Sequence, residues 1–60
     1  MENMINMDPN ILVSIINMKL RDFYSNLKDL CDDLNISESE LKSKLKSANY
    51  EYIEEQNQFK

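Results

Sequence analysis

This chain must hold a fold of only 60 residues together without covalent or metal cross-links. It has one cysteine, Cys31, and no histidine, so neither an internal disulfide nor a zinc site rich in cysteine and histidine can form. A domain of this size buries only about 60% of the surface that its unfolded chain exposes, which leaves its stability marginal. Helix packing and self-association are therefore the expected supports of the fold.

The composition is that of a globular domain, with 42% hydrophobic and 30% charged residues. The net charge is −4, whereas domains that bind nucleic acids are usually basic, so a nucleic-acid partner is disfavoured. The longest continuous apolar run, Ile11 to Val13, is far shorter than the roughly 20 residues of a membrane span. The segment Met1 to Met7 contains Glu2 and no basic residue, unlike a secretory signal. These features predict a cytoplasmic protein without a membrane partner.

The first helix is predicted over residues 9–22, after a flexible N-terminal arm of residues 1–7. Asp8 suits the N-cap and Pro9 suits the first helical position, because proline has no amide to leave unbonded. At about 100° per residue, the apolar side chains cover an arc of roughly 220°. Those residues are Ile11, Leu12, Val13, Ile15, Ile16, Met18, Leu20 and Phe23. An ordinary surface helix needs an apolar face only somewhat wider than 100°, so this helix has more apolar surface than one small core can cover.

The excess apolar surface of this helix predicts a contact site. One side of the arc is expected to face the other helices, and consists of Leu12, Ile16, Leu20 and Phe23. The other side would be exposed on a monomer and is the candidate dimer interface: Ile11, Ile15 and Met18. A competing possibility is that the N-terminal arm folds over this patch and keeps the protein monomeric. The polar stripe of the same helix, Ser14, Asn17 and Arg21, is expected to be its solvated face.

Two short helices and a hairpin are predicted after the first helix. Ser25 is expected to cap a helix over residues 26–34, and Ser37, with Glu40 three residues on, predicts a capping box for a helix over residues 38–48. Left-handed residues are expected at three asparagines, Asn35, Asn49 and Asn57, because the chain has no glycine. Strand residues around a four-residue turn predict a hairpin over residues 50–60. The predicted fold is thus a mostly α, single small domain over residues 8–60, a three-helix, helix-turn-helix-like domain with a short C-terminal β-hairpin.

The third helix is the alternative candidate for function. In helix-turn-helix proteins the second helix of the motif reads bases in the major groove. Here that helix would present four candidate nucleic-acid contacts: Ser39, Lys42, Ser43 and Lys46. However, acidic residues occupy its first turn, no arginine lies in it or in the hairpin, and the hairpin that would form the wing is acidic. A packing or protein-contact role is therefore preferred for this helix.

No catalytic or cofactor chemistry is predicted. The chain has no histidine and no glycine-rich phosphate loop, and Cys31 lies on an apolar helix face without an imidazole partner. Free cysteine commonly behaves as a small buried hydrophobe. The aspartates Asp29, Asp32 and Asp33 do not have the spacing of a calcium loop. The expectation is a protein that is not an enzyme and needs no metal.

Several sequence blocks resemble a family of very short bacterial proteins catalogued as a domain of unknown function. The blocks are Asp8 to Leu12, Asn17 to Asp22, Leu30 to Leu34, Tyr50 to Tyr52 and Asn57 to Phe59. The resemblance covers nearly the whole chain from Asp8 and implies a bacterial, cytoplasmic source. It implies no activity, ligand or catalytic residue. The preferred hypothesis is therefore a small protein-interaction module that forms a homodimer through its first helix, with an unidentified protein partner as a further possibility. A nucleic-acid-binding regulator with a degenerate winged helix-turn-helix is the alternative.

Overall fold

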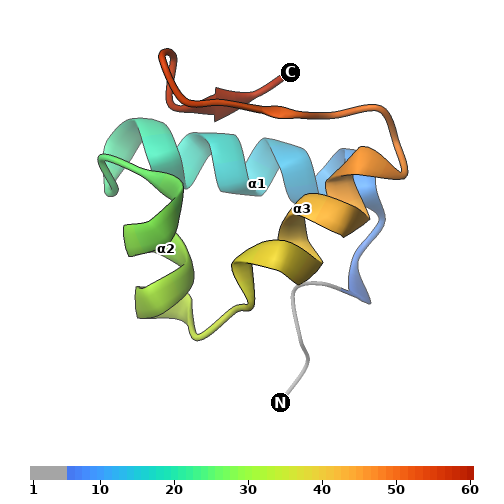
Figure 1. Ribbon diagram of the computed structural model, residues 1–60, viewed down its shortest axis with the longest axis horizontal. Helices are drawn as coiled ribbons and strands as arrows, with labels where there is room; N and C mark the ends of the chain where they lie inside the picture. The colour runs from blue at the N-terminus through green and yellow to red at the C-terminus, as the bar shows by residue number, and fades with distance from the viewer. Residues whose placement is uncertain (1–5) are drawn as a thin grey trace.

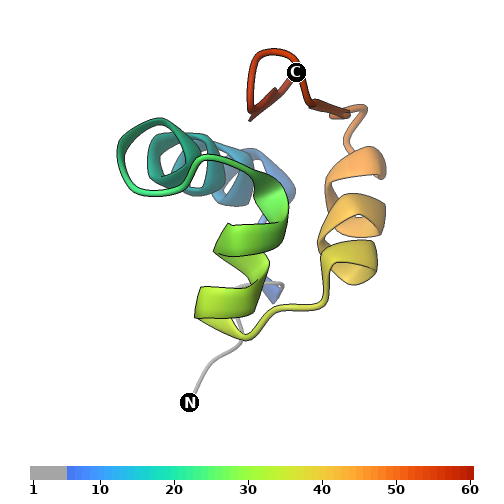
Figure 2. The same ribbon diagram turned by 60° about the vertical axis from the view of Figure 1, so that its left-hand side comes forward.

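The computed structural model describes residues 6–60 and confirms the predicted fold class (Figure 1). Its elements are α1 (Pro9–Asp22), α2 (Leu27–Leu34), α3 (Glu38–Lys46), β1 (Tyr52–Ile53) and β2 (Gln58–Phe59). The two strands are antiparallel, with Tyr52 opposite Phe59. Figures 1 and 2 place the hairpin along α1 at one end of the domain and the connection between α2 and α3 at the other end. Most of the predicted N-terminal arm lies outside the described residues.

The start of α1 follows the prediction, whereas α2 starts one residue later than expected. Asp8 is the N-cap of α1, and its carboxylate accepts a hydrogen bond of 2.8 Å from the amide of Asn10. For α2 the N-cap is Asn26 and not Ser25, because the Asn26 side-chain oxygen accepts from the amide of Asp29 at 2.7 Å. Asparagine and serine are comparable caps, so adjacent candidates were not separable from the sequence alone.

The three asparagines expected in the left-handed region are all found there. The φ angles are 57° at Asn35, 69° at Asn49 and 52° at Asn57. Asn35 follows α2 and Asn49 follows α3, and in each case the next residue donates its amide to a carbonyl five residues earlier. This pattern ends a helix by satisfying its last carbonyls. In this chain asparagine thus adopts the left-handed backbone conformation for which glycine is commonly used at such positions.

The core forms where the three helices and β2 meet. Its buried side chains are Leu12, Val13, Ile16, Leu20, Leu27, Leu30, Cys31, Leu41, Leu45 and Phe59. Of the four residues assigned to this side, the three on α1 are buried as predicted, but Phe23, just after the helix, is 71% exposed. Phe23 is the C-cap of α1, with φ −126°, so its backbone has left the helix and its side chain no longer follows the helical period.

Two asparagine side chains fasten the hairpin to α1. The Asn17 amide donates to the Phe59 carbonyl at 3.0 Å, and its oxygen accepts from the Phe59 amide at 2.7 Å. Asn57 donates to the carbonyls of Leu20 and Tyr24 at 3.1 and 3.0 Å, and accepts from the Tyr52 hydroxyl at 2.7 Å. The prediction that Asn17 belongs to the solvated face is wrong, since this side chain is part-buried and binds a strand.

Ser37 is the N-cap of α3, and we expect Ser37→Ala to destabilise the domain. The Ser37 hydroxyl accepts from the Glu40 amide at 3.4 Å, although within residues 6–60 the reciprocal bond of a capping box is not formed. Loss of an N-cap typically costs about 1 kcal/mol. For so small a domain this corresponds to a decrease in Tm of about 4–8 °C. Thermal unfolding followed by circular dichroism measures the change, and an unchanged midpoint would show that Ser37 does not cap α3.

Candidate interaction face on helix α1

The side of α1 that faces away from the core carries large apolar side chains. Ile11 is 58% exposed and Met18 is 45% exposed, and Ile15, between them in sequence, is half-buried. Their spacings of four and three residues place them on one face of a helix. We call these three residues the outer apolar stripe. The three residues predicted as a dimer interface thus share one face of α1, on which Ile11 and Met18 are exposed and Ile15 is half-buried.

Small and polar residues border the outer apolar stripe. Ser14 is exposed and lies three residues after Ile11 and four before Met18, so it belongs to the same face. Beyond Met18, Arg21 and Asp22 form an exposed ion pair of 3.0 Å, and this contact lowers the pKa of the Asp22 carboxyl. A polar depression of about 580 Å³ also begins beside Met18, lined by Ser14, Asn17, Met18, Leu20, Arg21, Gln56, Asn57 and Gln58. An apolar centre with a polar margin is the usual anatomy of a protein interface.

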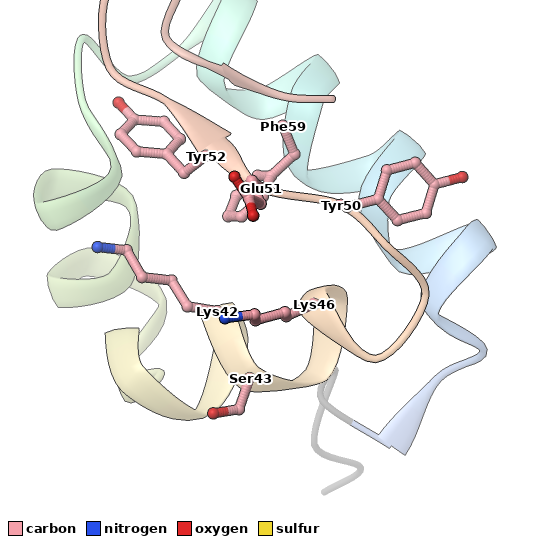
Figure 3. Close-up of a pocket in the computed structure, with 7 residues that line it drawn as sticks. All are labelled: Lys42, Ser43, Lys46, Tyr50, Glu51, Tyr52 and Phe59. Carbon is pink, nitrogen blue, oxygen red and sulfur yellow. The ribbon is translucent and has the colours of Figure 1, made fainter.

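The structure brings three of the four candidate nucleic-acid contacts together. Lys42, Ser43 and Lys46 line a groove of about 310 Å³ between α3 and the strand segment that leads into β1 (Figure 3). Ser39 is not part of this groove, and its hydroxyl lies 3.2 Å from that of Ser37. Glu51 lies on the opposite wall of the groove. The groove could not be predicted from the sequence, because it depends on how the hairpin returns over α3.

Basic side chains on all three helices make ion pairs with carboxylates. Lys42 makes an ion pair of 3.0 Å with Glu38, one turn before it on α3. Lys28 on α2 makes an ion pair of 3.1 Å with Asp32, and Arg21 is paired with Asp22 on α1. Binding to DNA requires several cations that are free to neutralise phosphates. Of the two lysines that line the groove, Lys42 already has a carboxylate partner.

We expect no measurable binding of duplex DNA at physiological salt. The net charge of −4 repels the phosphate backbone, and Lys42 is already paired with Glu38. Fluorescence anisotropy with labelled mixed-sequence duplexes is the appropriate measurement. Sub-micromolar binding that weakens with salt and disappears in the double variant Lys42→Ala, Lys46→Ala would contradict this expectation.

The remaining reactive and acidic groups form no metal-binding cluster in residues 6–60. Cys31 is buried, and burial is the main cause that raises the pKa of its thiol, so the thiolate is disfavoured. The Tyr24 hydroxyl donates to Asp33, which raises the pKa of Tyr24. Within the described part of the chain no three acidic, cysteine or histidine side chains are placed to hold a metal ion. The same residues include no helix long and apolar enough to cross a membrane.

Comparison with known proteins gives a family and no activity. A search of curated proteins and a search of solved structures each found no match. The family model described as domain of unknown function DUF4250 matches residues 6–59, which include all three helices and the hairpin. The match agrees with the resemblance drawn from the blocks between Asp8 and Phe59. The chain belongs to the DUF4250 family.

Proposed function

We propose that this protein is a small, non-enzymatic protein-interaction module of the cytoplasm that forms a homodimer through the outer apolar stripe of α1. The observation that carries the proposal is the exposure of Ile11 and Met18 on the face of α1 opposite its buried side chains. Soluble monomers seldom leave contiguous large apolar side chains open to water, and such patches commonly mark contact sites. Met7, just before the helix, is also 37% exposed and adds to the apolar surface at this end.

The amount of exposed apolar surface on and beside the stripe predicts a weak dimer. The exposed parts of Met7, Ile11 and Met18 amount to about one and a half whole side chains in each protomer. Full burial of one such side chain contributes about 1.5–3 kcal/mol, so two protomers gain about 4–9 kcal/mol. Association costs about 4–15 kcal/mol in lost rigid-body freedom and ordering. The apolar gain and the cost are of similar size, so we expect a dimer that dissociates on dilution.

A two-fold axis across α1 suits this face. In such a dimer the same patch meets itself, so Ile11 of one protomer can pack near Met18 of the other. The small side chain of Ser14, between them on the helix surface, allows the two backbones to approach. Lys19 and Asp22 border the stripe, where they can make charge contacts at the margin of the interface. Such marginal ion pairs contribute little affinity but favour one register.

We expect Ile11→Glu to abolish self-association and leave the fold intact. Ile11 is 58% exposed, so a carboxylate is solvated in the monomer but would be buried opposite its symmetry mate in the dimer. Backbone amide shifts in NMR spectra recorded over a dilution series report the association. The wild type should show concentration-dependent shifts along α1, and the variant should show none.

The matched control for this experiment is Ser39→Glu, which adds the same charge at an exposed position of α3. It should self-associate as the wild type does. Concentration-dependent shifts in the wild type that map to the hairpin or α3 would place the interface elsewhere. Equal association of Ile11→Glu and the wild type would exclude the outer apolar stripe.

The alternative function, a nucleic-acid-binding regulator, is supported by the position of Lys42, Ser43 and Lys46 along one side of α3 beside the hairpin. It is opposed by the net charge of −4 and by the pairing of Lys42 with Glu38. DNA binding requires several free cations, and among residues 6–60 Lys46 is the one lysine of the groove wall without an ion-pair partner, so we rank this function second.

A further inference from the structure

The two outer edges of the hairpin differ in how their backbone groups are bonded. Glu51 and Lys60 exchange both backbone hydrogen bonds, each of 2.9 Å. In an antiparallel ladder such pairs alternate with pairs whose N–H and C=O groups point outward. The next pair, Tyr52 and Phe59, is therefore of the outward type. On the β2 side the outward groups of Phe59 are bound by Asn17, as they would be by another strand.

The outer edge of β1 has no such partner among residues 6–60. The amide and carbonyl of Tyr52 point away from β2, and neither takes part in a hydrogen bond within the described part of the chain. Unpaired strand edges are templates for the addition of another strand, and proteins commonly cover or block them. Here one edge is covered by a side chain, and the other is open.

A groove follows the open edge. The cavity between α3 and the strand segment is lined by Lys42 and Lys46 on one wall and by Tyr50, Glu51 and Tyr52 on the other (Figure 3). A second cavity of about 340 Å³ shares Lys42 and Tyr52 with the first and continues toward α2. The two cavities are therefore neighbours, and both are lined by Tyr52 of β1. Peptide recognition by strand addition uses such a site, with backbone bonds from the edge and side-chain contacts from the walls.

We propose that the groove between β1 and α3 binds an extended peptide segment of a partner protein, which adds to β1 as a third strand and carries acidic side chains toward α3. The Tyr52 amide donates to a peptide carbonyl, and the Tyr52 carbonyl accepts from the amide of the same peptide residue. This site lies on the hairpin and α3, and it is separate from the outer apolar stripe of α1. The two proposals can therefore fail independently.

Charge and spacing favour an acidic peptide. Lys46 has no ion-pair partner among residues 6–60, and Lys42 is half-exposed beside Glu38. Residues four apart on a helix are about 6 Å apart along its axis. Alternate residues of a strand, whose side chains share a face, are about 6.8 Å apart. Two carboxylates at alternate positions of the peptide can thus reach Lys42 and Lys46 together. The neutral peptide residues between these two acidic residues then lie on the face of the sheet that Glu51 occupies.

The test uses an end-capped peptide of four threonine–glutamate repeats and a matched peptide of four threonine–lysine repeats. Each is titrated into ¹⁵N-labelled protein and followed by NMR. We expect the acidic peptide to bind with a Kd of about 1 mM or tighter and to shift the amides of Tyr50, Glu51 and Tyr52. The Tyr52 amide should also exchange with solvent more slowly when the peptide is bound. The basic peptide should bind about tenfold more weakly, because it loses two charge contacts.

Two controls separate strand addition from simple charge attraction. N-methylation of the acidic peptide at the residues whose amides face β1 should abolish binding. N-methylation of the intervening residues, whose amides face away from β1, should be tolerated. The exposed double variant Lys42→Gln, Lys46→Gln should bind both unmethylated peptides equally. Absence of any shift at Tyr52, shifts without slower exchange of its amide, or equal binding of both methylated peptides would overturn the proposal.

Discussion

Replacing Asn57 by alanine is expected to lower the free energy of unfolding by about 3 kcal/mol. Part of the loss arises because alanine tolerates the left-handed backbone less well than asparagine, and Asn57 has φ 52°. The larger part arises because the carbonyls of Leu20 and Tyr24 and the hydroxyl of Tyr52 lose their partner in a part-buried setting. The whole domain is expected to have only about 3–9 kcal/mol of stability. Urea unfolding followed by circular dichroism should therefore show a variant that unfolds at a much lower urea concentration than the wild type.

The matched control is Asn35→Ala. Asn35 has nearly the same backbone conformation, with φ 57°, but it is exposed and its side chain makes no hydrogen bond within residues 6–60. This variant isolates the backbone contribution, and we expect it to cost about 1 kcal/mol. Equal losses for Asn35→Ala and Asn57→Ala would mean that the Asn57 side chain does not fasten the hairpin to α1.

Leu12→Ala should be destabilising by about 3 kcal/mol, while Ile11→Ala, one residue earlier, should change the stability by less than about 1 kcal/mol in the monomer. Leu12 is fully buried in the core, so its truncation leaves a cavity. Ile11 is 58% exposed, so its truncation removes mostly solvated surface. The comparison tests directly which way α1 faces.

Thermal or urea unfolding at low protein concentration measures both changes without a contribution from self-association. Similar losses at the two positions would mean that Ile11 is buried, either in the core or by another segment of the same chain. That result would support the competing expectation that the N-terminal arm covers the patch.

The starts and ends of the helices were predictable where they depend on neighbouring residues. Asp8 and Ser37 cap helices through bonds to amides two or three residues away, and Asn35 ends a helix through its own backbone conformation. Phe23 was placed wrongly in the core because the helical period was extended one residue past the helix. The period applies only while the backbone remains helical, and the C-cap has already left it.

The candidate sites divide in the same way. The outer apolar stripe was predictable because Ile11, Ile15 and Met18 share a face by helix geometry alone. The role of Asn17 could not be predicted, since its partner, Phe59, is 42 residues away in the chain. The open edge of β1 could not be predicted either, because it depends on contacts between distant residues. Asn17 covers the outer edge of β2, and this leaves the outer edge of β1 as the open one. A polar residue at the border of a buried helix face is the only sequence signal that such a contact leaves.

Sedimentation equilibrium of the wild-type protein over a range of concentrations tests the proposed self-association most directly. The monomer has a mass of 7.1 kDa. We expect the weight-average mass to rise with concentration toward twice that value, and the rise to be absent in Ile11→Glu. A wild-type protein that remains at the monomer mass up to millimolar concentration would contradict the proposal that the outer apolar stripe of α1 binds a second copy of this chain.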